Sequence, residues 1–147
     1  MKFTCSVEID QPIDKVIELF DNPDNLKEWQ DGFVSFDHLS GIPGEPGAKS
    51  KIIYKNKGQT IELIETLLVK NLPYEMSGTY EHKHMVNNMS NHFKALGDDK
   101  TEWVANLEYT KLNGFLPKLM AFIMPGMFRK QTQKWLNQFK TFAESRG

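Results

Sequence analysis

Cysteine is nearly absent from this 147-residue sequence, in which Cys5 is the only one. A single cysteine excludes an internal disulfide and fits a reducing compartment. An excess of one charge is absent too, since the net charge is −1. A neutral balance supplies neither the basic face that nucleic acid needs nor a polybasic tract for an anionic membrane. We therefore expect no nucleic-acid partner.

Long uninterrupted apolar runs are also missing. Residues 1–10 become polar and acidic too soon to contain the apolar core of a signal peptide. The most apolar segment, residues 115–128, contains Pro117, Pro125 and Gly126. It is also shorter than the roughly 20 residues of a membrane span. These absences predict a cytoplasmic protein without stable membrane insertion.

No internal repeat, low-complexity tract or linker divides the chain. Its length is that of one domain, and its composition, 39% hydrophobic and 25% charged, is typical of a globular protein with a buried core. We therefore expect a single domain over residues 1–147.

Alternation of apolar and polar residues, which is typical of half-buried strands, marks much of the chain. It is clearest at Trp103, Ala105, Leu107 and Tyr109, and it is also present over residues 3–9. Further strands are expected near 34–36 and over 48–55, 59–70, 74–82 and 85–96. The turn at 56–58 predicts a hairpin.

Helical spacing appears at three places. Ile13, Val16, Ile17 and Phe20 follow Pro12 at intervals of three and four, which predicts a short helix, and Leu26 and Trp29 predict a second. A long helix is expected over 115–143. Its first half is apolar around most of its circumference, and beyond a kink expected at Pro125-Gly126 it becomes amphipathic.

This order of elements predicts an α+β helix-grip fold. A curved, seven-stranded antiparallel sheet would wrap around the long C-terminal helix, with two short helices after the first strand. Because a strongly twisted sheet around one helix leaves space in its middle, we expect a hollow between the two, on the order of several hundred Å³.

Several segments, in this order and spacing, carry a resemblance to a known family: QPIDKV at 11–16, NLKEW at 25–29, GIPGEPG at 41–47, IELIET at 61–66 with LP at 72–73, Phe93 with TEW at 101–103, and MPGMF at 124–128 with FK and F at 139–142. The chain resembles the START-like (SRPBCC) helix-grip superfamily, in its polyketide cyclase/dehydrase and lipid-transport branch. The resemblance implies a cavity for hydrophobic ligands. No cyclase-type catalytic motif can be matched to this sequence.

The leading hypothesis is a non-enzymatic binder or carrier of a small hydrophobic molecule, such as a lipid, a polyketide or an aromatic metabolite. The ligand would lie between the sheet and helix 115–143, and the turn at 41–47 would flank the mouth. The residues expected to bind it are Trp29, Met89, Asn91, Phe93, Trp103, Leu107, Tyr109, Leu119, Phe122, Ile123 and Met127. The many methionines suit such a lining, and they suit a soft core equally well.

Glu62 and Glu65 are the candidate catalytic residues. They lie three apart in an apolar strand whose alternation is ambiguous, so one of them faces inward. An inward carboxylate has a raised pKa and can act as an acid or base. It can equally hydrogen-bond a ligand or pair with a lysine. A cyclase- or dehydratase-like enzyme is therefore the first alternative.

The second alternative is an interaction module that buries the Met- and Phe-rich surface at 120–128 against a partner or a second copy. We expect a monomer or a weak homodimer.

No metal or cofactor is expected. His82 and His84 share a strand face, but no cysteine accompanies them and Glu81 points the other way. The glycine-rich turn at 41–47 is no phosphate loop, because Pro43 and Pro46 lack the N–H groups that a phosphate needs.

Overall fold

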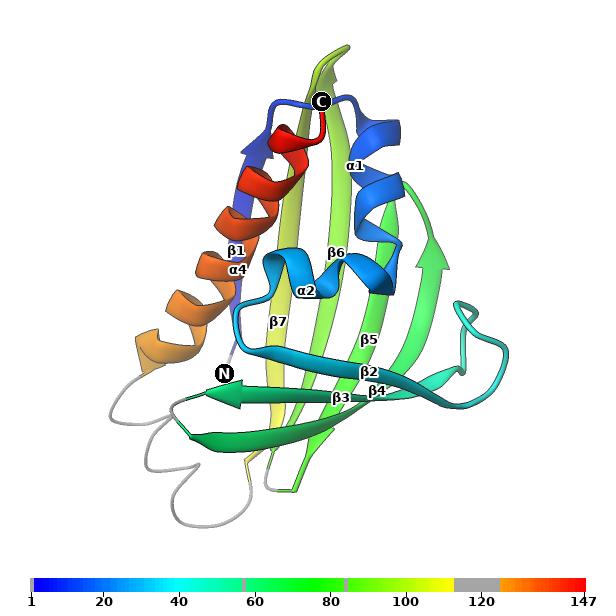
Figure 1. The fold of residues 1–147 in the computed structure, drawn as a ribbon, viewed down its shortest axis with the longest axis vertical. Coiled ribbons are helices and arrows are strands. Elements are labelled where there is room, and N and C mark those ends of the chain that lie inside the picture. The colour runs from blue at the N-terminus through cyan, green and yellow to red at the C-terminus, as the bar shows by residue number, and fades with distance from the viewer. Residues whose placement is uncertain (1, 57, 84, 113–124) are drawn as a thin grey trace.

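The computed structural model describes residues 2–56, 58–83, 85–112 and 125–147. Seven strands form one antiparallel sheet in the order β1-β7-β6-β5-β4-β3-β2, and the helices lie against one face of it (Figure 1). The predicted α+β helix-grip architecture is confirmed. The elements in chain order are β1 (Lys2–Ile9), α1 (Ile13–Phe20), the 3-10 turn η1 (Pro23–Asn25), α2 (Leu26–Trp29), β2 (Phe33–Ser40), β3 (Lys49–Asn56), β4 (Gln59–Asn71), β5 (Glu75–His82), β6 (Met85–Gly97), β7 (Lys100–Leu112) and α4 (Pro125–Ser145).

The alternation in β1 and β7 sets which face of the sheet is buried. Phe3 pairs with Leu107 and Cys5 with Ala105, so apolar side chains of neighbouring strands lie side by side. All four are buried. We call this helix-covered side the inner face, and the opposite side the outer face.

The long helix α4 lies along β1 (Figure 1). Thr132, Leu136, Phe139 and Ala143 follow each other at helical spacing, and all are buried, as the amphipathic pattern predicts. The helix begins at Pro125, where a proline costs no hydrogen bond because first-turn N–H groups have no partner within the helix. The predicted helical stretch 115–124 lies outside the described residues.

The two short helices cross the inner face in front of β5, β6 and β7 (Figure 1). Val16 and Leu19 of α1 and Trp29 of α2 are the buried residues that hold them there. The side chain of Asn22 accepts a hydrogen bond from the Asp24 N–H at 3.0 Å and so begins the turn that leads into α2. These helices cover the middle of the sheet.

The sheet bends strongly, so that β2 and β3 run across the lower ends of β6 and β7 in Figure 1. A bulge between Leu67 and Val69 interrupts the pairing of β4 with β5 and contributes to this bend. Gly41 opens the turn before β3 at a φ of +79°, where a Cβ would lie 2.8 Å from the Ala48 Cα. No helix in the described part of the chain is long and apolar enough to cross a membrane.

Candidate functional site

A pocket of about 120 Å³ lies between the inner face of the sheet and the segment from α1 to α2. We call it the inner pocket. Its lining comes from the helical segment above and from β2 to β7 below, and it includes Phe20, Leu26, Trp29, Gln30, Ile52, Tyr54, Glu65, Leu67, Met76, Tyr80, Met89, Asn91 and Trp103. None of its described lining residues belongs to α4.

Glu65 is a charged group on the floor of the inner pocket. In the register of the sheet it pairs with Ser50 of β3, which is buried, and with Tyr80 of β5. The Tyr80 hydroxyl donates a hydrogen bond to the Glu65 carboxylate. Burial raises the pKa of Glu65, and this hydrogen bond partly opposes the rise. Glu65 therefore keeps its proton to a higher pH than an exposed glutamate does.

Tyr54 lies beside Glu65 on the same face. Its hydroxyl donates a hydrogen bond to Gln30 Oε1 at 2.8 Å, which ties β3 to the end of α2. Burial raises the pKa of Tyr54, and the nearby charge of Glu65 raises it further. Tyr54 is thus a neutral hydroxyl group at neutral pH.

Three aromatic rings form one wall of the inner pocket. The Phe20 and Trp103 ring centroids are 5.2 Å apart, and those of Trp29 and Trp103 are 5.9 Å apart, both in edge-to-face contact. Such contacts between large rings hold the wall rigid. The Trp29 Nε1–H has no hydrogen-bond partner among the described residues and is sealed from solvent, so only the ring of Trp29 is available to a ligand.

Asn91 supplies the polar group behind this wall. Its Oδ1 accepts a hydrogen bond from Trp103 Nε1 at 2.9 Å, and its Nδ2 donates to the Met76 carbonyl at 3.3 Å. Both ends of the amide are therefore used within the protein, and Asn91 orients Trp103.

Four residues predicted to bind the ligand line the inner pocket, namely Trp29, Met89, Asn91 and Trp103. Phe93 lies behind the wall, with its ring stacked on that of Trp103 at 5.7 Å. Of the two candidate carboxylates, Glu65 faces the pocket, whereas Glu62 is exposed.

The other predicted residues lie elsewhere. Leu107 is buried in the core, and the Tyr109 ring packs on Phe128 of α4 at 4.7 Å. Met127 is 41% exposed. Leu119, Phe122 and Ile123 lie outside the described residues. As ligand contacts, all of these residues stay predictions.

Sequence reasoning missed Tyr54, Tyr80, Phe20 and Gln30. The alternation of Ala48, Ser50, Ile52 and Tyr54 was the available signal for Tyr54, since these four residues are the buried side of β3 and the residue before it. Tyr80 and Gln30 had no comparable signal, because their role depends on how β5 and α2 meet the other strands.

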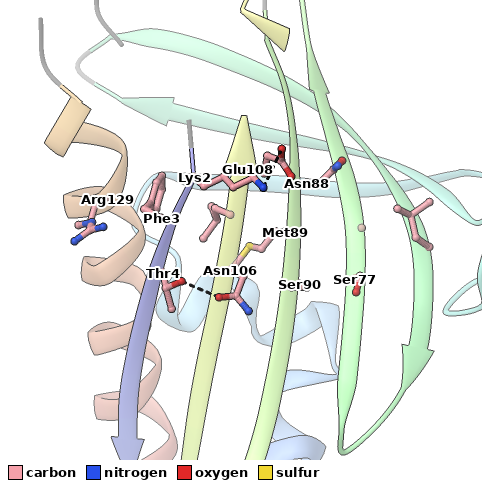
Figure 2. Close-up of a pocket in the computed structure, with 13 residues that line it drawn as sticks. Lys2, Phe3, Thr4, Ser77, Asn88, Met89, Ser90, Asn106, Glu108 and Arg129 are labelled. Carbon is pink, nitrogen blue, oxygen red and sulfur yellow. Dashed lines mark hydrogen bonds and ion pairs between the residues drawn. The ribbon is translucent and has the colours of Figure 1, made fainter. Parts of the chain in front are cut away.

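A larger hollow of about 610 Å³ is lined by residues of β1, β4, β5, β6 and β7 and by Arg129 of α4, and its lining includes Met89 and Leu107, two of the predicted ligand-binding residues (Figure 2). Thr4, Asn106 and Ser90 pair across β1, β7 and β6 there, and the Thr4 hydroxyl donates to Asn106 Oδ1 at 2.8 Å. Lys2 and Glu108, 3.9 Å apart, are largely exposed. Since binding sites for small molecules are mostly apolar with a few placed polar groups, the inner pocket is the better candidate.

No group of three or more His, Cys, Asp or Glu residues is placed to hold a metal ion in the described ranges. His84, one of the two histidines considered as a pair, lies outside them. Chemically, the inner pocket offers aromatic and aliphatic walls, two tyrosine hydroxyls and the carboxyl groups of Asp21 and Glu65, of which Asp21 is paired with Lys70. That set can hold a mostly apolar molecule and orient one polar group, and Glu65 is the candidate acid or base of the pair predicted from the sequence.

A scan against protein-family models finds no match, and neither does a search of curated proteins. Solved structures do match. The aromatase/cyclase ZhuI from Streptomyces sp. R1128 superposes with a TM-score of 0.82 at 11% identity, covering 99% of this chain and 94% of that one. The protein TTHA0849 from Thermus thermophilus has a TM-score of 0.80 at 13% identity, covering 100% and 99%.

A START superfamily protein from Mycobacterium smegmatis also matches, with a TM-score of 0.67 at 14% identity over 93% of this chain and 97% of that one. Identities this low show the fold. The chain has the START-like helix-grip fold, as the resemblance in its sequence implied.

Proposed function

We propose that this START-like domain binds a small, mostly apolar molecule in the inner pocket. The observation that carries the proposal is the lining itself: a wall of Phe20, Trp29 and Trp103 faces a floor on which Glu65 and Tyr80 are joined. Apolar walls supply affinity, and a few placed polar groups supply orientation. The fold supports it, because the solved structures that it matches include an aromatase/cyclase and a START superfamily protein.

The size of the inner pocket limits which ligands can fit in it. A volume of about 120 Å³ is close to the roughly 150 Å³ of an engineered cavity that binds benzene. Among the ligands predicted from the sequence, a single-ring aromatic metabolite fits this space, whereas a full lipid chain or a polyketide exceeds it. We therefore infer a ligand built around one ring.

The expected affinity follows from the buried area. A single ring buries on the order of 150–250 Å², which at about 25 cal/mol per Å² gives about 4–6 kcal/mol. This corresponds to a Kd of about 0.04–1 mM for a probe without further specific contacts. Benzyl alcohol is a suitable neutral probe, titrated by calorimetry.

Filling the inner pocket with a larger side chain tests whether it is the binding site. Met76 lines the inner pocket and Met127 is exposed on α4. Met76→Trp therefore fills the pocket, whereas Met127→Trp adds the same atoms at a surface position. We expect Met76→Trp to abolish binding of benzyl alcohol and Met127→Trp to leave it unchanged. Absence of binding to the wild-type protein, or undiminished binding to a folded Met76→Trp variant, would contradict the proposed function.

If the probe binds as expected, native mass spectrometry of protein purified from its own host would identify the natural ligand.

A further inference from the structure

We propose that the inner pocket selects a ligand with a positively charged amine on a one-ring apolar body, and that Glu65 is the anionic partner of that amine. This ligand class rests on the proposed function and specifies it further. It depends on three features: the charges around the pocket, the surroundings of the Glu65 carboxylate, and the nature of the walls.

The charges around the pocket are of one sign. Its described lining includes two acidic residues, Asp21 and Glu65, and no lysine, arginine or histidine. Asp21 has a partner, since Lys70 Nζ lies 3.2 Å from its Oδ1. Glu65 is in no ion pair within the described residues. Among the described residues, one inward carboxylate thus has no cationic partner, and no positive group lines the pocket to receive a bound anion.

The Glu65 carboxylate also has unused hydrogen-bonding capacity. Two carboxylate oxygens can accept about four hydrogen bonds, and the Tyr80 hydroxyl supplies one. An ammonium group has three N–H donors and a full charge, so it compensates a half-buried carboxylate better than a neutral hydroxyl does. Burial raises the pKa of Glu65, which is the response expected of a carboxylate without a cation, and a bound amine would oppose that rise.

The walls suit a cation as well. Trp29, Tyr54, Tyr80 and Trp103 all line the pocket, and an aromatic ring attracts a cation placed over its face, the more so when the cation is desolvated. An aromatic pocket that contains a carboxylate without an ion-pair partner among the described residues is therefore expected to select amines over alcohols and acids of the same shape.

Three isosteric probes test this on the wild-type protein at neutral pH: benzylamine, which is protonated, benzyl alcohol, which is neutral, and benzoate, which is anionic. We expect benzylamine to bind about tenfold more tightly than benzyl alcohol and benzoate not to bind detectably in calorimetry. Equal affinities for amine and alcohol, or tighter binding of benzoate, would overturn the amine proposal and leave the proposed function standing. Failure of all three probes would contradict both.

Two glutamine variants locate the effect. Glu65→Gln keeps the shape of the side chain and removes its charge, and Glu62→Gln makes the same change on the outer face of the same strand. We expect Glu65→Gln to lose the preference for benzylamine while its affinity for benzyl alcohol is kept, and Glu62→Gln to behave as wild type. A preference that survives in Glu65→Gln would overturn the assignment. The wild-type series is decisive even if Glu65→Gln does not fold.

Discussion

Asn91 is a buried polar residue whose side-chain amide makes hydrogen bonds that no apolar residue could make. It is 5% exposed, and its amide serves the buried Trp103 N–H and the carbonyl of the half-buried Met76. A buried donor or acceptor that loses its partner costs more than the hydrogen bond contributed. Asn91 therefore stabilises the fold and, through Trp103, holds one wall of the inner pocket in position.

Replacement of this residue tests that role. We expect Asn91→Ala to lower the free energy of unfolding by about 1–3 kcal/mol, because it leaves the Trp103 N–H buried and without this acceptor. Asn88→Ala, on the outer face of the same strand, is the control and should change stability far less. Urea unfolding followed by tryptophan fluorescence measures both. Similar losses in the two variants would show that the Asn91 amide has no special role.

Which of the two glutamates of β4 faces inward could not be predicted from the sequence of this strand alone. Ile61, Leu63 and Leu67 share the inner side with Glu65, but Ile64 and Leu68 are apolar and point the other way, so the strand carries no clear alternation. Only pairing with Ser50 and Tyr80 fixes the inward phase. The sequence predicted that one of the pair faces inward, and the neighbouring strands decide that it is Glu65.

Among the elements, the strands and α4 were the predictable part. The alternation at Trp103, Ala105 and Leu107 and the buried face of α4 follow directly from residue spacing, and both are confirmed. The sequence predicted a hollow of several hundred Å³ between the sheet and helix 115–143, whereas the inner pocket is about 120 Å³ and no described residue of α4 lines it, because its position depends on packing between elements. Phe139 of α4 packs against Trp29 at 5.1 Å and against Trp103 at 5.3 Å. Its ring occupies the contact between α4, α2 and β7, and the inner pocket lies on the other side of Trp29 and Trp103, under α1 and α2.

Phe139 is therefore the side chain that joins α4 to both the sheet and the short helices. It is 0% exposed, and we expect Phe139→Ala to lower the free energy of unfolding by about 3–5 kcal/mol, because the cavity left behind adds to the lost burial. Lys130→Ala, at an exposed position of the same helix, is the matched control and should have little effect. Chemical denaturation gives both values. A loss below about 1 kcal/mol in Phe139→Ala would mean that the helix docks through other residues.

At the scale of the whole molecule, several tyrosine hydroxyl groups lie on the inner face of the sheet. Burial is the main cause that raises the pKa of each of Tyr54, Tyr80 and Tyr109. The first two lie in the inner pocket, and Tyr109 packs beside α4. Because burial disfavours the charged form of each hydroxyl, ionisation of these tyrosines opposes folding. The stability of the fold is therefore expected to depend on pH in the alkaline range.

The sign of this coupling follows from the direction of the shifts. Burial raises the pKa of Tyr109 from 10.0 to about 12, so between these values the unfolded chain releases a proton that the folded protein keeps. Stability is then fully present below about pH 10 and falls as the pH rises. We expect the free energy of unfolding, from urea titrations, to be lower at about pH 11 than at about pH 8. Tyr109→Phe keeps the ring without the titrating hydroxyl, so its stability should fall less over the same interval; an equal fall would show that Tyr109 does not contribute.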